Sequence, residues 1–287
     1  MPIKVVVIGA NGQLGKSIQF YLDAKPNNAD FYFFSRTDLD ISNEAQMRSQ
    51  LETIVPDYIL NCSAYTAVDK AETESEQADL INHQAIINLA QITNELQATL
   101  IHISTDFVFD GSKNTPLVEE DICNPIGVYG LTKYAGEQAI ASNTNKYFII
   151  RTSWLYSNIG ANFFTNITKY ATDRDALNVV YDQVGTPTLT YDLVKAILQL
   201  IEQRPTDYGI YHFSNEGVCS WYDFATELVS MQHITCNILP ILSAQYPTPA
   251  KRPAYSVLNK NKIKTLLGIT IPHWRESLYK LIHKQIL

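Results

Sequence analysis

The sequence predicts an α/β fold in which a doubly wound parallel sheet carries a smaller C-terminal lobe. Short apolar runs rich in β-branched residues alternate with segments of helical periodicity along most of the chain, a pattern typical of a parallel sheet with helices on both faces. The first of these runs passes directly into a glycine-rich turn. After Gly217 the alternation fades and prolines become frequent, which indicates a change of architecture.

The composition is that of an ordinary globular protein. The chain has 287 residues, of which 46% are hydrophobic and 18% charged, so it can bury a sizeable core in one large or two modest domains. The formal net charge of -7 argues against a nucleic-acid-binding protein, whose domains are usually basic. A phosphorylated small ligand stays compatible with this charge, because a few local donors can hold phosphate.

Cysteine usage and hydropathy favour a cytoplasmic protein. The cysteines Cys62, Cys123, Cys219 and Cys236 are scattered and form no C-x-x-C pair, which favours reduced thiols. No apolar run approaches the roughly 18 residues of a membrane span, so we expect no membrane association. Residues 1–10 show no features of a secretory signal.

The elements can be placed in order along the chain. Strands are expected at 3–8, 30–35, 56–61, 99–106, 147–151, 178–180 and 210–213. Helices are expected at 16–23, 43–54, within 77–97, and at 162–172, 193–202 and 221–231, and Ser42 is the expected N-cap of the second. We assign residues 1–153 and 188–216 to a sheet domain, and residues 154–187 and 217–287 to a smaller lobe that closes over it.

The turn after the first strand is a candidate phosphate-binding site. It consists of Gly9, Ala10, Asn11, Gly12, Gln13, Leu14 and Gly15, and a helix follows at once. Glycines permit a tight turn and the close approach of a pyrophosphate, and the helix N-terminus offers unpaired N–H groups. The strand, turn and helix together predict a Rossmann-type dinucleotide-binding domain; a purely structural turn is the alternative.

The end of the second strand bears on the choice of dinucleotide. An acid at this place would accept hydrogen bonds from the 2′-hydroxyl of NAD. Here the residues are Ser35 and Arg36, which suit a 2′-phosphate and favour NADPH, with NADH also compatible. The alternative is that Arg36 is a solvated surface residue.

The loop after the third strand lies where ligands bind in a doubly wound sheet, beyond the carboxyl ends of the strands. Its small residues, at 62–67, are placed to pass under a dinucleotide. Asp69, Lys70 and Glu72 follow them, and the sequence leaves two interpretations open: substrate contacts, or the charged first turn of a helix.

Polar residues also end the strand at 99–106. The hydroxyls of Ser104 and Thr105 could bond a substrate oxygen or merely cap the strand. His102 alternates with apolar neighbours, which favours a core histidine over a catalytic one.

A tyrosine and a lysine stand four residues apart where a helix is expected to begin. Tyr129 and Lys133 would share one face of that helix. A phenol has an ordinary pKa of about 10, and a nearby cation favours the phenolate and lowers this value. The pair is therefore a candidate proton donor, although the same spacing also arises by chance in helices.

Several motifs together resemble those of the extended short-chain dehydrogenase/reductases, and among them the dTDP-4-dehydrorhamnose reductase family. The resemblance covers most of the chain. It rests on residues 9–15, 66–72, 104–111, 129–133, 151–154, 182–188 and 252–258.

This resemblance implies reduction of the C4 ketone of dTDP-4-dehydro-L-rhamnose by NAD(P)H. Tyr129 would be the acid, Lys133 would hold the cofactor ribose and lower the pKa of Tyr129, and Thr105 would hydrogen-bond the reacting oxygen. Val68, Asp106 and Trp154 match family positions at the substrate. The implied cofactor contacts are Gly12, Gln13, Leu14, Asp40, Ile41, Ala64, Tyr65, Thr66, Tyr129 and Lys133.

Departures from related families refine this expectation. Sugar-nucleotide dehydratases carry a glutamate after the Thr-Asp pair, whereas this chain has Phe107, which cannot act as an acid or base. Some reductases bind magnesium through a glutamate early in the first helix; Lys16 and Ser17 stand in that region, so we expect no such metal, and the sequence does not decide whether a homodimer forms. The alternatives are an epimerase or dehydratase, and a non-catalytic NADP-binding protein resembling the regulatory subunit of methionine adenosyltransferase.

Overall fold

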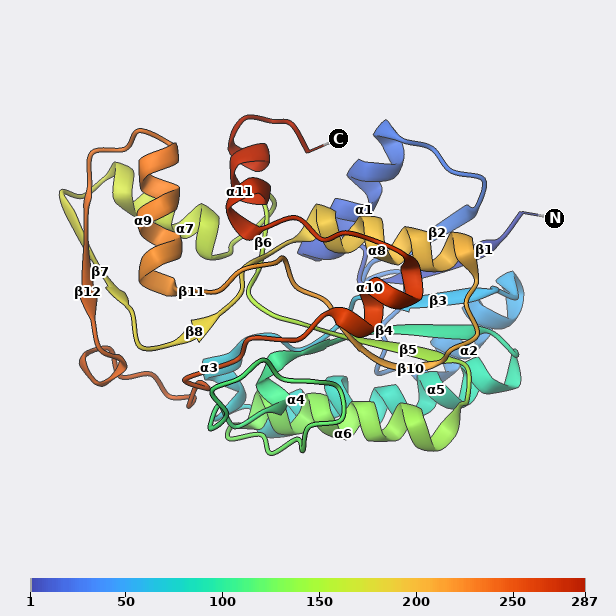
Figure 1. Ribbon diagram of the computed structural model, residues 1–287. Coiled ribbons are helices and arrows are strands. Elements are labelled where there is room, and N and C mark those ends of the chain that lie inside the picture. Colours follow the sequence, from blue (N-terminus) through green and yellow to red (C-terminus); the bar gives the residue numbers. More distant parts are fainter. Residues whose placement is uncertain (1, 287) are drawn as a thin grey trace.

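In the computed structural model, which describes residues 2–286, six parallel strands form a central sheet (Figure 1). The strand order reverses next to β1, so β1 and β3 end at a crevice of the kind in which doubly wound sheets bind ligands. All six strands were expected from the sequence, with small shifts at their ends. In spatial order they are β10 (Gly209–His212), β5 (Tyr147–Thr152), β4 (Thr99–Thr105), β3 (Tyr58–Asn61), β1 (Lys4–Ile8) and β2 (Asp30–Phe34).

Helices cover both faces of this sheet (Figure 1). One face carries α1 (Gln13–Ala24), α8 (Thr190–Gln203) and α10 (Asn261–Leu267). The other carries α2 (Glu44–Ile54), α5 (Ala85–Glu95) and α6 (Val128–Asn143). Alternate residues of β1 enter the two cores and are fully buried, which explains why the run is apolar throughout rather than every second residue.

Several helix boundaries differ from the expectation, and α1 and α8 each begin three residues earlier. Asn43, not Ser42, caps α2 by accepting a hydrogen bond from the N–H of Gln46 (3.1 Å). The prediction of Ser42 is wrong because its hydroxyl donates to the carboxylate of Asp40 (2.7 Å) instead. The helical region expected within 77–97 is divided into α4 (Ser75–Asp79), a π-helical turn η1 (Leu80–Gln84) and α5.

A second core lies beside the sheet. It is formed by α7 (Phe163–Thr172), α9 (Trp221–Met231) and α11 (Trp274–Ile282), with the parallel pair β7 (Ala176–Val180) and β12 (Asn237–Ile241). Two short pairs connect it to the sheet: β6 (Leu155–Tyr156) with β9 (Thr188–Leu189), and β8 (Val184–Gly185) with β11 (Cys219–Ser220).

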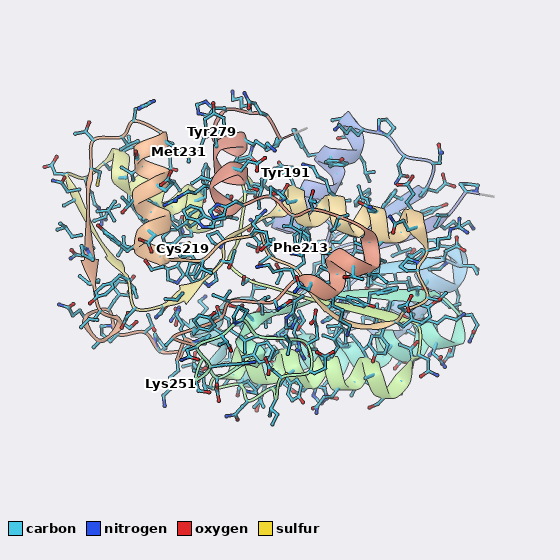
Figure 2. All side chains as sticks on the ribbon, viewed as in Figure 1. Tyr191, Phe213, Cys219, Met231, Lys251 and Tyr279 are labelled. Carbon is cyan, nitrogen blue, oxygen red and sulfur yellow. The ribbon has the colours of Figure 1, made fainter. Side chains whose placement is uncertain are left out.

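Helix α8 links the two cores. Its first turn brings Tyr191 into the second core, whereas its later residues pack on the sheet in the core that also contains Phe213 (Figure 2). The two packing units therefore share one continuous helix.

Candidate functional site

A cavity of about 680 Å³ lies at the carboxyl ends of β1, β3 and β4, between the sheet and the second core. Its size is within the usual range for ligand sites. Most residues that the sequence assigned to a site line it. These are Gly9, Asn11, Gly12, Gln13, Leu14, Arg36, Asp40, Ile41, Ala64, Thr66, Val68, Thr105, Asp106, Tyr129, Lys133 and Trp154.

Three expected contacts lie outside the cavity wall. Gly15 packs against the turn, where an added Cβ would come within 2.6 Å of a carbonyl oxygen. The hydroxyl of Ser35 donates to the carboxylate of Asp38 (2.6 Å). The hydroxyl of Tyr65 donates to Glu74 (2.5 Å). The side chains of Ser35 and Tyr65 stabilise the loops around the cavity.

The β1–α1 turn forms a cradle of backbone N–H groups. Gly9 has φ +88°, and a Cβ at this position would lie 2.8 Å from the backbone nitrogen of Ser63, so only glycine fits between the two loops. No side chain caps the start of α1 after Gly12, and the side-chain nitrogen of Gln13 is buried without a partner among the described residues. The unpaired donors and the helix dipole fit an anionic group such as a pyrophosphate.

The edge of the cavity near β2 carries both a cation and an anion. The Arg36 side chain is 75% exposed and lies 3.7 Å from the carboxylate of Asp40. Hydrogen bonds from Ser42 hold the pKa of Asp40 below its ordinary value. The arginine is therefore free to turn to a ligand, and Asp40 stays an anion.

Tyr129 and Lys133 lie on the buried side of the first turns of α6. Burial, with a smaller contribution from Asp106, raises the pKa of Tyr129 to about 12. Lys133 donates to the carbonyl oxygen of Ile103 (2.8 Å) and lies 2.9 Å from Nε2 of His102, and burial lowers its pKa to about 8. The expected lowering of the Tyr129 pKa by Lys133 is not found, because burial has the larger effect and the amine bonds to β4.

Helix α6 is held in place at its first turn. The carboxylate of Glu72 accepts a hydrogen bond from the N–H of Val128 (2.9 Å), which satisfies a donor at the helix start. A Cβ on Gly130 would lie 2.2 Å from the carbonyl oxygen of Phe107. The helix backbone therefore lies directly against η2 (Asp106–Val108), and this contact fixes Tyr129 beside Thr105.

The Thr105–Asp106 pair lies beside the phenol. Thr105 accepts from the N–H of Phe107 (3.2 Å) and donates to Oδ1 of Asp106 (3.1 Å), so it is both a cap and a cavity residue. Oδ2 of Asp106 is buried and has no partner among residues 2–286, and burial raises the pKa of this carboxyl to about 6. The Phe107 ring lies edge-on to Tyr129, with centroids 5.5 Å apart.

Aromatic side chains form the opposite wall. Trp154 stacks on Trp221, and Phe163 packs against Trp221 with centroids 4.5 Å apart. Trp221 and Phe163 could not be predicted as site residues, because they come from α9 and α7 and belong to no local motif. Only the tertiary packing brings them to the cavity.

A polar contact joins the C-terminal segment to the sheet side. Arg252 lines the cavity and forms an ion pair with Asp69 in α3 (Val68–Ala71), with 2.8 Å between Nη2 and Oδ2. Asp69 and Glu72, for which two interpretations were open, thus serve as an interlobe contact and as the cap of α6. Arg252 belongs to the motif at residues 252–258 that resembles the reductase family, and this motif is the sequence feature that could have identified it as a site residue.

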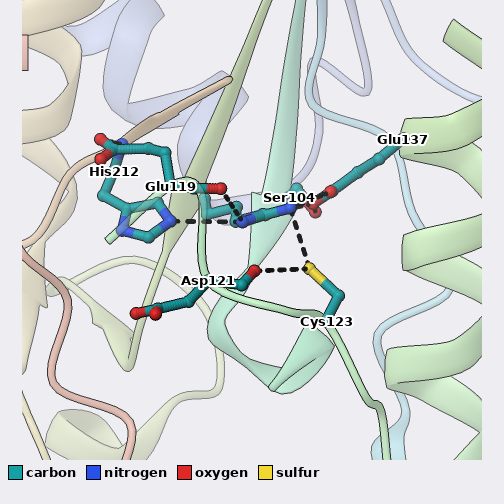
Figure 3. Close-up of polar contacts among 7 residues, drawn as sticks. Ser104, Glu119, Asp121, Cys123, Glu137 and His212 are labelled. Atoms are coloured by element: carbon teal, nitrogen blue, oxygen red, sulfur yellow. Dashed lines mark hydrogen bonds and ion pairs between the residues drawn. The ribbon is translucent and has the colours of Figure 1, made fainter. Parts of the chain in front are cut away.

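A buried ion pair lies behind the cavity, between β5 and α6 (Figure 3). Nη2 of Arg151 is 2.7 Å from the carboxylate of Glu137, and the hydroxyl of Ser104 donates to the same carboxylate (2.5 Å). Arg151 also donates to Sγ of Cys123 (3.1 Å). Breaking a pair buried to this extent would leave an uncompensated charge, so these contacts hold α6 against β4 and β5.

Among residues 2–286, no three His, Cys, Asp or Glu side chains are grouped to hold a metal ion, and no helix is long and apolar enough to cross a membrane. All four cysteines carry free thiols.

Comparisons with known proteins identify a family and close structural neighbours. The family described as RmlD substrate binding domain matches residues 3–286. A dTDP-4-dehydrorhamnose reductase of Sinorhizobium fredii is 37% identical over 294 residues, covering 99% of this chain and 98% of its own. The spore coat polysaccharide biosynthesis protein SpsK of Bacillus subtilis is also 37% identical, with 98% of each chain covered.

Solved structures agree with these relatives. The dTDP-4-dehydrorhamnose reductase of Bacillus anthracis, determined in complex with NADP, superposes with a TM-score of 0.95 at 39% identity and covers 99% of this chain and all of its own. A UDP-glucose 4-epimerase of Thermotoga maritima reaches a TM-score of 0.81 at 17% identity, with 98% of each chain covered. The epimerase therefore shares the fold.

Proposed function

This chain belongs to the RmlD substrate-binding-domain family, and from this membership we propose that it reduces the C4 ketone of dTDP-4-dehydro-L-rhamnose to dTDP-L-rhamnose with NADPH or NADH. The observation that carries the proposal is the cavity described above, which brings three parts together. It joins the backbone cradle after β1 to the half-buried Tyr129 and, across from it, to the aromatic wall. A ketone reductase needs these three parts: a dinucleotide site, a proton donor and a wall for the substrate.

We propose that the sheet side of the cavity, within residues 1–153 and 188–216, holds the dinucleotide. When bound, NADPH supplies the hydride. The unpaired N–H groups at the start of α1 would bind the pyrophosphate, Arg36 would reach the 2′-phosphate, and Lys133 would bond the ribose. The remaining assigned contacts are Gly9, Asn11, Gly12, Gln13, Leu14, Gly15, Ser35, Asp40, Ile41, Ala64, Tyr65, Thr66 and Tyr129.

The proton chemistry is assigned to Tyr129. As the ketone carbon gains a hydride, its oxygen becomes an alkoxide that needs a proton and hydrogen bonds. The raised pKa keeps the phenol of Tyr129 protonated at neutral pH, so the proton passes from its Oη to the sugar oxygen. The hydroxyl of Thr105 would turn from Asp106 to donate its hydrogen bond to the same oxygen. Burial of these groups strengthens each of these interactions.

The sugar nucleotide is assigned to the remaining walls, with Val68, Asp106 and Trp154 as contacts. The lobe of residues 154–187 and 217–287 supplies the aromatic surface. Phe107 follows Asp106 where a dehydratase would need an acid or base, so reduction is favoured over dehydration. The four free thiols accord with a cytoplasmic location.

The test is oxidation of NADPH by the purified protein with dTDP-4-dehydro-L-rhamnose, followed by its absorbance and by product analysis. Formation of dTDP-L-rhamnose is expected. As a parallel arm, dTDP-4-dehydro-6-deoxyglucose without an added epimerase should stay unchanged. Conversion of that sugar to an epimer or dehydrated product, or NADP binding with no reduction of any 4-keto sugar nucleotide, would contradict the proposal.

A further inference from the structure

Three buried side chains form a hydrogen-bonded chain behind the proposed acid pair. Asn61 and His102 are register partners on β3 and β4, and both are fully buried. Nδ2 of Asn61 lies 3.1 Å from Nδ1 of His102, and Nε2 of the same imidazole lies 2.9 Å from Nζ of Lys133. The proposed reaction gives neither Asn61 nor His102 a part.

The polarity of this chain is fixed at Ser63. Oδ1 of Asn61 lies 3.0 Å from the backbone nitrogen of Ser63 and 2.6 Å from its hydroxyl. A backbone N–H can only donate, so the amide oxygen must face Ser63 and the amide nitrogen must face His102. That nitrogen also only donates. Nδ1 of His102 is therefore an acceptor, and a neutral imidazole then carries its proton on Nε2.

The same polarity reaches Lys133. Burial holds the pKa of His102 well below its ordinary value, so the ring is neutral at neutral pH. Its Nε2–H donates towards Nζ of Lys133, and an ammonium has no lone pair to accept this bond. A neutral amine can accept it while donating to the carbonyl oxygen of Ile103 (2.8 Å).

We infer that His102, held in one tautomer by Asn61, is a positioning residue that couples the protonation of Lys133 to the orientation of a buried amide and imidazole. For Lys133 to carry a proton and donate to His102, the imidazole proton must move from Nε2 to Nδ1. The Asn61 amide must then turn, which leaves its NH2 group facing the N–H of Ser63. The hydrogen bonds from Ser63 through Asn61 to His102 therefore favour the neutral amine of Lys133. When Lys133 takes up a proton from water, the imidazole tautomer and the Asn61 amide must both reverse.

A second buried histidine supplies an internal reference of opposite polarity. Nδ1 of His212 lies 3.1 Å from the carbonyl oxygen of Leu117, which only accepts. Nε2 of His212 (Figure 3) lies 3.4 Å from Nη1 of Arg151, which only donates. His212 therefore carries its proton on Nδ1. Two buried histidines of one sheet thus hold opposite tautomers.

Other ionisable groups near Lys133 also affect whether its amine is protonated. Glu137, one turn further along α6, favours the ammonium, but it is itself paired with Arg151 on β5. Tyr129 and Asp106 lie on the cavity side. His102 on β4 is the group in direct contact with the amine. The tautomers are a property of the protein alone, whereas their effect on turnover rests on the proposed reduction.

The tautomers can be observed directly by nitrogen NMR of the full-length protein labelled with ¹⁵N-histidine, without cofactor or substrate, at a pH of about 9, which is above the pKa of Lys133 and leaves its amine neutral. The His102 signal is expected to show a proton on Nε2, and the His212 signal a proton on Nδ1. His102→Gln and His212→Gln assign the two signals. Ser63→Ala should leave the His102 tautomer unchanged, because the N–H that fixes the polarity remains. A proton on Nδ1 of His102 in the wild type would overturn the inference.

The link to Lys133 is tested by Asn61→Asp. A carboxylate accepts from both Ser63 and Nδ1–H, so the imidazole should reverse and Nε2 should accept from the ammonium. The Lys133 pKa, followed by ¹³C NMR of labelled lysine, and the alkaline limb of kcat/KM should both rise by about one pH unit. A reversed tautomer with an unmoved lysine titration would overturn the coupling. A wild type that reduces no sugar nucleotide would refute the proposed function and leave both NMR tests standing.

Discussion

Trp154 and Trp221 lie face to face, with ring centroids 3.5 Å apart and planes inclined by 9°. Trp154 has a left-handed backbone, with φ +48°, a conformation that costs a bulky residue about 1–3 kcal/mol and is concentrated at functional sites. Trp221 begins α9 and comes from a remote part of the chain. The stack fixes a flat wall across the cavity from Tyr129.

Removing half of this stack should weaken sugar-nucleotide binding. Trp221→Ala is expected to raise KM for the sugar nucleotide about fivefold, because an aromatic pair contributes about 1 kcal/mol beyond the area it buries. The affinity for NADPH should be unchanged in a fluorescence titration. Trp274→Phe is the matched control, since Trp274 is buried in the same lobe outside the cavity wall. An unchanged KM in Trp221→Ala would contradict the assigned wall.

Removing the phenolic hydroxyl should stop proton transfer. Tyr129→Phe is expected to lower kcat at least about 100-fold, the usual size of a general-acid contribution, while NADPH affinity changes little. Tyr134→Phe, one turn further along the same helix and outside the cavity wall, should retain turnover. Normal turnover of Tyr129→Phe would remove Tyr129 from the mechanism.

Stability should depend on pH through Asp106. Burial raises the pKa of this carboxyl from 3.8 to about 6, so the folded state binds the proton more tightly and stability falls as pH rises through this window. At higher pH the buried, ionised carboxylate lowers the free energy of unfolding by up to about 3 kcal/mol. Asp106→Asn should therefore be more stable than the wild type in urea unfolding at about pH 7.5, and similar at about pH 3.5.

A carboxyl with the opposite shift provides the control for this prediction. Hydrogen bonds from Ser112 lower the pKa of Asp110, so Asp110→Asn should lose stability at neutral pH and not gain it. Equal changes in stability for the two substitutions at both pH values would show that burial does not set the pKa of Asp106.

The close contact at Gly130 should resist a single added methyl group. Gly130→Ala is expected to lower the free energy of unfolding by about 1–3 kcal/mol, the usual cost of overpacking, and to lower kcat because α6 carries Tyr129. Gly268→Ala is the comparison, since Gly268 has φ +64° and no neighbour within 4 Å of its Cβ position. It should lose stability and keep kcat. Equal kcat in both variants would show that α6 can move away from η2 without displacing Tyr129 from the site.

The sequence predicted those features whose cause is local. The turn around Gly9 is required by its conformation, and the spacing of Tyr129 and Lys133 follows from helical geometry. The central strands β1, β3, β4 and β5 were predicted because strands buried on both faces form continuous apolar runs. In β12 the local signal is instead misleading, because Pro240 argues against a strand. The structure accommodates it in a two-stranded pair, where the missing N–H can face outward.

Residues whose function depends on long-range packing could not be predicted from their neighbours. Arg252 meets Asp69 only because the C-terminal segment crosses to the sheet. His102 was expected to be a core residue, and it is fully buried. Its contact with Lys133 depends on how α6 lies over β4, which no pattern within either segment encodes.

The position of β10 at the edge of the sheet has a consequence for the order of synthesis. β10 pairs with β5, yet the residues of α7, β7, β8, β9 and α8 are translated between them. As the chain leaves the ribosome, one edge of β5 has no partner until residues 209–212 have been made. Open edges of this kind invite pairing with other chains, so the nascent protein must protect β5 while a large part of the neighbouring lobe is still being added.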